Sequence, residues 1–262
     1  MTTFIVSLND IRNRVKEEAL LLSNFIVDVK ALKEKQLESA IDTSNSFRQT
    51  ERDIKAGVYP LPTTKKEKED YDFWQKYGET VADALKMKAN LIEKYEELLH
   101  NMALIYSTAL FDAQFLDLVK ILLLSNENSL KSSKTITIET VLQHSSLDTL
   151  KSYILNKELV EFGFKSLSDQ IKYVSEKFNL NFKNEKIEID EIIEIIETRN
   201  IHVHNRGIIN SIYLTNTKST IYYLGDYRTI DNDYLEKSRK SLNKFINHLL
   251  DLTIEKLKYC PS

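Results

Sequence analysis

The sequence predicts an all-α protein: an antiparallel helical bundle with a small β-hairpin and an N-terminal helical extension. Only 5 glycines and 3 prolines interrupt the 262 residues, too few for the many turns of a β-sandwich or a barrel. Apolar residues also recur at helical spacing over long segments, with charged residues between them. We expect residues 1–85 to form an N-terminal helical hairpin and residues 86–262 to form the main helical domain.

The N-terminal region is predicted to contain two long helical patterns. The first runs from about Asn9 to Ala40, where apolar residues return every three or four positions. The next segment, Ile41–Thr64, is polar and contains one glycine and two prolines, so we expect a loop. A helical pattern then resumes near Lys65 and runs, with a break, to about Ser125. The polar residues 126–133 end it.

Shorter elements are expected in the C-terminal half. The segments 208–214 and 220–224 are β-branched and aromatic and flank a turn-prone sequence, which predicts the small hairpin. Thr137 and Ser166 stand where N-cap residues are expected. Helices are predicted over Thr137–Gln143, Leu147–Phe162, Leu167–Phe178, Ile189–Val203 and Asn232–Tyr259.

Composition narrows the classes of function. The formal net charge is −3, so any nucleic acid must bind to a local patch rather than to a globally positive surface. A single cysteine, Cys260, excludes an internal disulfide and favours a reducing compartment. The first residues lack the pattern of a secretory signal, and no apolar run is long enough to span a bilayer. We therefore expect a cytoplasmic protein that does not insert into membranes.

One segment concentrates residues suited to phosphate chemistry. It contains two histidines, two arginines and two asparagines within residues 199–206, and no Asp or Glu occurs between positions 198 and 225. On a helix, Asn200 and His204 lie one turn apart on the same face, beside Arg199. Arginine offers a charged fork of donors to phosphate oxygens, and histidine transfers protons near neutral pH. This combination suits attack by a ribose 2′-hydroxyl on its own phosphodiester without a metal.

The spacing alone leaves a structural alternative open. A histidine near the end of a helix can simply interact with the helix dipole or with the last carbonyl groups. An Arg-x4-His spacing is also weak evidence in a chain that contains 5 histidines.

The extended pattern Arg199-Asn200-x3-His204-Asn205-x-Gly207 resembles the signature of the HEPN domain family, over roughly residues 91–259. The resemblance implies an all-α bundle that dimerises, with two copies of the motif forming one composite ribonuclease site. It maps Arg199 and His204 onto the catalytic pair and Asn200 onto the family's polar position. The implied activity is metal-independent endoribonuclease cleavage that leaves 2′,3′-cyclic phosphate ends, in a toxin–antitoxin, abortive-infection or antiviral-defence system.

This sequence has one copy of the motif, so the resemblance implies an RNA-binding homodimer, or pairing with another chain that carries the motif. Its N-terminal helices are candidates for contact with an antitoxin or another regulatory protein. The alternative is a non-catalytic HEPN-like module for dimerisation or for binding a nucleotide or a protein. We expect neither a metal nor a cofactor, because no zinc-ligand or phosphate-loop motif occurs.

Residues around the catalytic candidates are assigned by proximity. We expect Arg206, Asn205 and His202 to contact RNA, because they share the segment that lacks acidic residues, with a surface or packing role as the alternative for His202. Three tyrosines of the predicted hairpin can stack on bases, although packing is the commoner role for such residues: Tyr213, Tyr222 and Tyr223. Three glutamates before the motif are expected to form a solvated acidic face: Glu191, Glu194 and Glu197. The alternative for Glu197 is to pair with Arg199 or to orient it.

Overall fold

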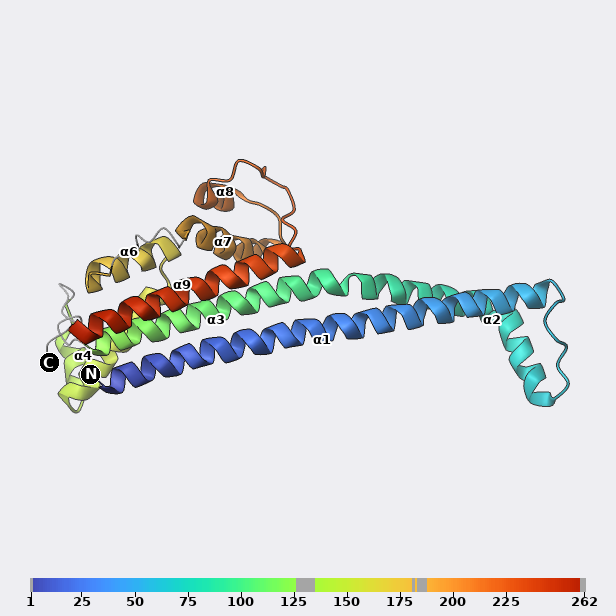
Figure 1. Ribbon diagram of the computed structural model, residues 1–262, viewed down its shortest axis with the longest axis horizontal. Coiled ribbons are helices and arrows are strands. Elements are labelled where there is room, and N and C mark those ends of the chain that lie inside the picture. Colours follow the sequence, from blue (N-terminus) through green and yellow to red (C-terminus); the bar gives the residue numbers. More distant parts are fainter. Residues whose placement is uncertain (1, 126–134, 181, 183–187, 260–262) are drawn as a thin grey trace. The chain divides into compact units, whose positions relative to one another are not determined.

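The computed structural model describes residues 2–125, 135–180, 182 and 188–259, and the elements of this part are all α-helices joined by connecting segments (Figure 1). This confirms the predicted all-α class. The helices are α1 (Thr2–Lys55), α2 (Lys65–Glu93), α3 (Tyr95–Ser125), α4 (Ile138–Leu142), α5 (Leu147–Gly163), α6 (Leu167–Phe178), α7 (Ile189–Asn205), α8 (Ser211–Thr217) and α9 (Asn232–Tyr259). They form two compact units, one of residues 1–20 with 101–262 and the other of residues 21–100. The predicted end of the second helical pattern, residues 126–133, lies outside the described residues.

The unit of residues 21–100 is a helical hairpin of α1 and α2, joined by residues 56–64. Small side chains let the two helices approach closely, and the buried Ser44 donates a hydrogen bond to the Ala82 carbonyl oxygen at 2.9 Å. Phe47 and Trp74 stack with ring centroids 4.3 Å apart. Thr64 begins α2 with a capping box, since its side chain and that of Glu67 satisfy each other's backbone amides.

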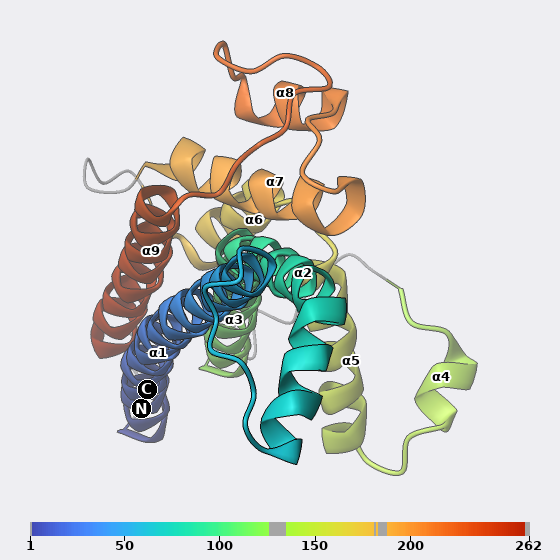
Figure 2. The ribbon, with the colours of Figure 1, turned by 90° about the vertical axis from the view of Figure 1, so that its right-hand side faces the viewer.

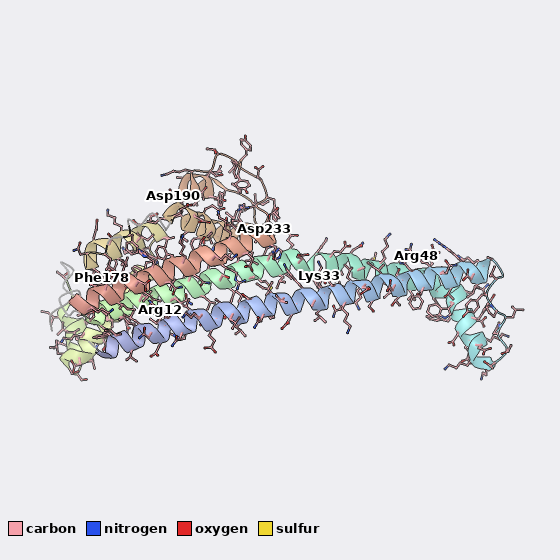
Figure 3. All side chains as sticks on the ribbon, in the orientation of Figure 1. Arg12, Lys33, Arg48, Phe178, Asp190 and Asp233 are labelled. Atoms are coloured by element: carbon pink, nitrogen blue, oxygen red, sulfur yellow. The ribbon has the colours of Figure 1, made fainter. Side chains whose placement is uncertain are left out.

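Ion pairs on the surface of this hairpin join charges that are far apart in the sequence. Arg48 of α1 contacts Asp83 of α2 at 2.7 Å, and Lys33 contacts Glu96 at 2.8 Å. The two basic residues are labelled on α1 in Figure 3.

The prediction of a loop over Ile41–Thr64 was wrong for its first part, where α1 continues to Lys55. The polar sequence there is a helix that buries small and apolar side chains such as Ser44 and Ile54.

The larger unit is organised around a core of aromatic rings. Phe111 and Phe115 of α3 contact Phe245 of α9 at ring centroid distances of 5.5 and 5.7 Å. Phe115 also meets Phe162 of α5 at 5.3 Å in a T-shaped arrangement. All four rings are 1% exposed, so they account for much of the apolar surface that stabilises this unit.

The shorter helices of the larger unit begin where capping residues were predicted. Thr137 caps α4, and the Ser166 hydroxyl accepts a hydrogen bond from the Asp169 amide at the start of α6. Lys94 separates α2 from α3, which accounts for the break expected between Lys65 and Ser125. The helices expected over Leu147–Phe162, Leu167–Phe178, Ile189–Val203 and Asn232–Tyr259 are all present, within two residues of their predicted ends.

The prediction of a hairpin over residues 208–214 and 220–224 was wrong. Residues 211–217 form α8, which packs on α7 (Figure 2). The side chain of Asn210 caps α8 by accepting from the Tyr213 amide at 2.9 Å. Tyr213 of α8 and Ile209, which precedes the helix, pack with Ile201 of α7, and all three are at most 2% exposed. Capping and burial therefore outweigh the strand preference of the β-branched residues. Among the described residues, pairing of extended backbone is limited to a bridge between Ile208 and Tyr227.

Candidate functional site

The motif occupies the second half of α7 and the turn that follows it. Asp190 and Glu191 in the first turn, and His202 and His204 in the last, match the sign of the helix dipole at each end. Ile192, Ile195, Thr198 and Ile201 face the core. This buried stripe leaves Arg199 and Asn200 partly exposed and His204 exposed.

The end of α7 depends on Gly207. The helix stops at Arg206, which has a φ of 53°, and Gly207 follows with a φ of 77°. The Gly207 amide donates to the Ile201 carbonyl oxygen at 3.0 Å, which closes the last turn. A β-carbon at Gly207 would lie 2.6 Å from Tyr227 Cε2 and 2.9 Å from His202 Cε1. Glycine is therefore required here both for its backbone conformation and for the close approach of two rings.

His202 faces the segment that follows α8. Its Nε2 lies 2.7 Å from the Arg228 carbonyl oxygen, which can only accept, so Nε2 carries the proton of this hydrogen bond. Its ring meets Tyr227 in a T-shaped contact at 5.9 Å. The structure thus places His202 against the backbone that closes the end of α7, whereas its role in RNA contact stays a prediction.

Arg199 reaches across to α3 and pairs with Asp112. The distance from Arg199 Nη2 to Asp112 Oδ2 is 2.9 Å, and 24% of the arginine side chain is exposed. Burial raises the pKa of Asp112, and the positive charge of Arg199 opposes that shift. No pattern in the sequence pointed to this partner, because Asp112 lies in a separate helix within an ordinary apolar pattern. The expected pairing of a glutamate of α7 with Arg199 is replaced by this contact.

Asn200 lies beside Glu197, which also contacts α8. The Asn200 Nδ2 is 3.5 Å from Glu197 Oε2, a weak contact. The Asn216 Nδ2 donates to Glu197 Oε1 at 2.9 Å. Glu197 is thus an acceptor for amides from two helices rather than a member of a solvated acidic face.

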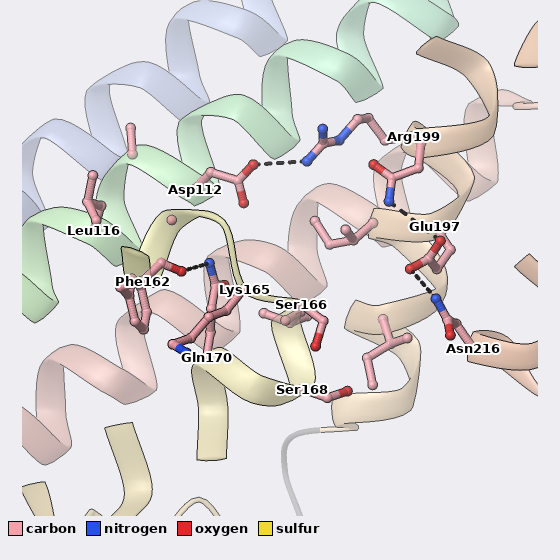
Figure 4. A pocket seen from close by; sticks show the side chains of 16 residues that line it. Asp112, Leu116, Phe162, Lys165, Ser166, Ser168, Gln170, Glu197, Arg199 and Asn216 are labelled. Atoms are coloured by element: carbon pink, nitrogen blue, oxygen red, sulfur yellow. Dashed lines mark hydrogen bonds and ion pairs between the residues drawn. The ribbon is translucent and has the colours of Figure 1, made fainter. Parts of the chain in front are cut away.

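Arg199, Asn200 and Glu197 line a pocket of about 590 Å³ between α3, the α5–α6 connection, α7 and α8 (Figure 4). Its charged side chains are two cations and two carboxylates, namely Arg199, Lys165, Asp112 and Glu197. Its apolar side chains include Phe162, Ile193 and Ile196. Figure 4 shows Asp112 and Arg199 facing each other on one side of the pocket, and Glu197 and Asn216 facing each other on another. A pocket of this size is in the range that binds small molecules or parts of larger ones.

The remaining motif residues lie beyond the lining of this pocket. His204 and Arg206 are exposed, and Asn205 donates to the Ile208 carbonyl oxygen at 2.6 Å. Within one chain, the motif therefore presents two surfaces. One is the pocket wall with Arg199 and Asn200, and the other is the exposed end of α7 with His204.

Glu194 is the centre of a polar network that the sequence analysis missed. Its carboxylate accepts from Thr198, Tyr213 and Tyr234 at 3.0, 2.9 and 2.7 Å and pairs with Arg228 at 3.1 Å. The prediction that Glu194 belongs to a solvated face was wrong, because 26% of its side chain is exposed and four side chains converge on it. Burial raises the pKa of Tyr213 to about 12 and also raises that of Tyr234.

The three tyrosines of the predicted hairpin have different surroundings. Tyr213 is fully buried, and Tyr222 packs against the Ile201, Ile209 and Tyr213 cluster, so packing is the role of these two. Tyr223 is 73% exposed. Arg228 lies over the rings of Tyr222 and Tyr234 at 5.0 and 4.1 Å. This network ties α7 to α8 and α9 and fixes the helix that carries the motif.

The described residues contain no group of three or more His, Cys, Asp or Glu side chains arranged to hold a metal ion. None of the helices in that part of the chain combines the length and apolar character that crossing a bilayer requires. We compared the chain with protein-family models, with curated proteins and with solved structures, and none of the three comparisons gave a match. The function must therefore be argued from the residues and their arrangement.

Proposed function

We propose that this protein is a metal-independent endoribonuclease of the HEPN type. The observation that carries the proposal is the motif of Arg199, Asn200 and His204 on one helix, with the arginine in a pocket wall and the histidine exposed one turn beyond Asn200. Arg199 and His204 are five residues apart, so along an α-helix they are separated by about 7.5 Å and point about 140° away from each other.

The roles of the three residues follow from their chemistry. The 2′-oxygen of a ribose attacks the adjacent phosphorus, a new P–O bond forms, and the bond to the 5′-oxygen of the next nucleotide breaks. His204 accepts the 2′-hydroxyl proton or donates a proton to the departing 5′-oxygen. Arg199 stabilises the charge that develops on the non-bridging oxygens, and Asn200 orients the phosphate or the imidazole. The products are a 2′,3′-cyclic phosphate and a 5′-hydroxyl.

The separation of Arg199 and His204 onto two surfaces supports a composite site. In one chain Arg199 turns toward Asp112, whereas His204 lies outside the pocket lining. A second copy of the chain would supply the complementary set, and so we propose a homodimer. Arg206, Asn205 and His202 are the proposed RNA contacts around that site. Such an enzyme fits a cytoplasmic toxin or antiviral-defence effector, with the helices of residues 1–85 available to an antitoxin or regulator.

The second candidate is a non-catalytic module that binds a nucleotide or a protein. The Arg199–Asp112 ion pair favours it, because a guanidinium that is already paired with a carboxylate is less available to a phosphate. The two candidates differ in whether RNA is cleaved and in whether His204 matters.

The test is cleavage of several RNAs in the presence of EDTA. We expect the wild-type protein to produce 2′,3′-cyclic phosphate ends, and His204→Ala and Arg199→Ala to lose at least a hundredfold in rate, in line with the removal of a general acid–base or a charge-stabilising group. His144→Ala and Arg52→Ala, which lie outside the motif, are the matched controls and should cleave normally. Equal cleavage by all five proteins would indicate a contaminating nuclease, and no cleavage by any would favour the binding module.

A further inference from the structure

The wall of the pocket between α7 and α8 offers hydrogen-bond acceptors. Glu197 accepts from the Asn216 amide at 2.9 Å and lies 3.5 Å from that of Asn200. Because a carboxylate only accepts, both asparagines must turn their NH2 groups toward Glu197. Their amide oxygens then point away from Glu197 and remain able to accept. The carboxylate itself retains unused acceptor positions, since each of its oxygens has two.

The rest of the lining supplies an apolar surface and positive charge. Ile193 and Ile196 of α7 and Leu116 of α3 give the apolar contacts that a planar ring requires. Arg199, which is partly exposed, and Lys165, which is exposed, supply the positive charges. The pocket therefore combines an acceptor-rich edge, an apolar surface and two cations, which together suit a nucleotide.

We propose that this pocket binds a guanine nucleotide, with the base edge at Glu197 and the phosphate toward Arg199 and Lys165. Guanine carries two adjacent donors on its Watson–Crick edge, N1–H and the N2 amino group, and these match a surface of acceptors. Adenine and cytosine each place one amino group next to an acceptor nitrogen, and uracil places one N–H between two carbonyls. Each of these bases would bring an acceptor against the oxygens of Glu197, Asn200 or Asn216, which disfavours binding.

This inference deepens the proposed function and, as a statement about the substrate, rests on it. In the ribonuclease, a guanosine in the pocket would place its phosphate at Arg199, and the chain would continue along α7 toward His204. The preferred substrate is then RNA with a guanosine next to the cleaved bond. Binding of the free nucleotide requires the pocket alone and can be tested independently of cleavage.

The experiment is calorimetric titration of the full-length wild-type protein with GMP, AMP, CMP and UMP. We expect GMP to bind at least tenfold more tightly than the other three, and Glu197→Gln to weaken GMP binding at least tenfold. Glu191→Gln is the matched control, because Glu191 lies on the same helix, pairs with Lys237 at 2.9 Å and does not line the pocket. Its affinity for GMP should equal that of the wild type.

The melting temperature of each variant shows whether it folds. If Glu197→Gln does not fold, Asn216→Ala serves as the second variant. It removes an acceptor from the exposed helix α8 and should also weaken GMP binding. Equal binding of all four nucleotides, no binding of any, or GMP affinity unchanged in the folded Glu197 and Asn216 variants would overturn the proposal. GMP binding without RNA cleavage would support the nucleotide site and contradict the proposed ribonuclease. EDTA-resistant cleavage without GMP binding would support the ribonuclease and contradict the nucleotide site.

Discussion

The guanidinium of Arg199 is held 2.9 Å from the carboxylate of Asp112, a residue of a different helix. This ion pair occupies a donor face that a phosphate would need. It also adds a negative charge to a pocket that is proposed to receive a nucleotide. Asp112 is therefore the described residue in most direct competition with the proposed substrate.

Removing that competition should strengthen RNA binding. We expect Asp112→Asn to lower the Kd for a 2′-O-methyl RNA, which lacks the attacking hydroxyl, by several-fold, because the guanidinium is freed and a nearby negative charge is lost. Fluorescence anisotropy at fixed salt measures this. Asp117→Asn is the control, since Asp117 lies on the same helix as Asp112 but pairs with Arg14 of α1, at 2.9 Å. Weaker binding by Asp112→Asn would mean instead that Asp112 orients Arg199 for the phosphate.

The Glu194 network should contribute strongly to stability. Glu194→Ala leaves Arg228 buried without its carboxylate partner, and the Arg228 side chain is only 12% exposed. We expect a loss of about 3 kcal/mol in the free energy of unfolding. Glu191→Ala breaks a pair whose lysine is 70% exposed and should cost less than about 1 kcal/mol. Urea unfolding of the two variants measures both, and equal losses would contradict the assigned importance of Glu194.

Gly207 should be the glycine that tolerates substitution least. Gly207→Ala forces a positive φ on an alanine and places its β-carbon 2.6 Å from a ring carbon of Tyr227. We expect a loss of about 2 kcal/mol or more. Gly163→Ala is the control, because nothing lies within 4 Å of its β-carbon and its φ is not positive. This alanine, at the end of α5, should be neutral or stabilising. A Gly207→Ala protein as stable as wild type would show that the turn relaxes without cost.

Alkaline pH should destabilise the larger unit through the tyrosines around Glu194. Burial raises the pKa of Tyr213 to about 12 and also raises that of Tyr234, so the unfolded chain ionises first. Below pH 10 the tyrosines are protonated in both the folded and the unfolded state. As pH rises from about 10 to 12 they ionise in the unfolded state first, so the free energy of unfolding falls. The free energy of unfolding, measured by urea titration between pH 8 and 11, should fall at the top of this range. Tyr213→Phe should make that fall shallower, and an unchanged slope would contradict the raised pKa.

Local signals in the sequence predicted most of the fold. Ser166 and Thr137 begin helices because their side chains cap the following amides, and such caps are visible in the sequence. The end of α1 was missed because residues 41–55 are polar and their burial depends on α2. The helix α8 was missed because two contributions stabilise it more than the strand preference of its β-branched residues opposes it. Asn210 caps its first turn, and Tyr213 is buried against α7.

The site was predictable only in part, for the same reason. The motif places Arg199, Asn200 and His204 on one helix, and this follows from spacing alone. The partners Asp112, Glu197 and Asn216, in contrast, are selected by packing between helices. The role of Glu194 also depends on long-range contacts, because Tyr213, Arg228 and Tyr234 reach it from three later segments. A glutamate at helical spacing looks the same in the sequence whether it is solvated or surrounded by donors.

The most direct test of the central claim is a double-mutant cycle on single-turnover RNA cleavage in EDTA, with Arg199→Ala, His204→Ala and the double variant. If the two residues act in one site, the double variant should lose no more than about tenfold beyond the slower single variant, because the first substitution already removes their joint effect. Losses that multiply, or a His204→Ala protein that cleaves at the wild-type rate, would contradict a shared catalytic site.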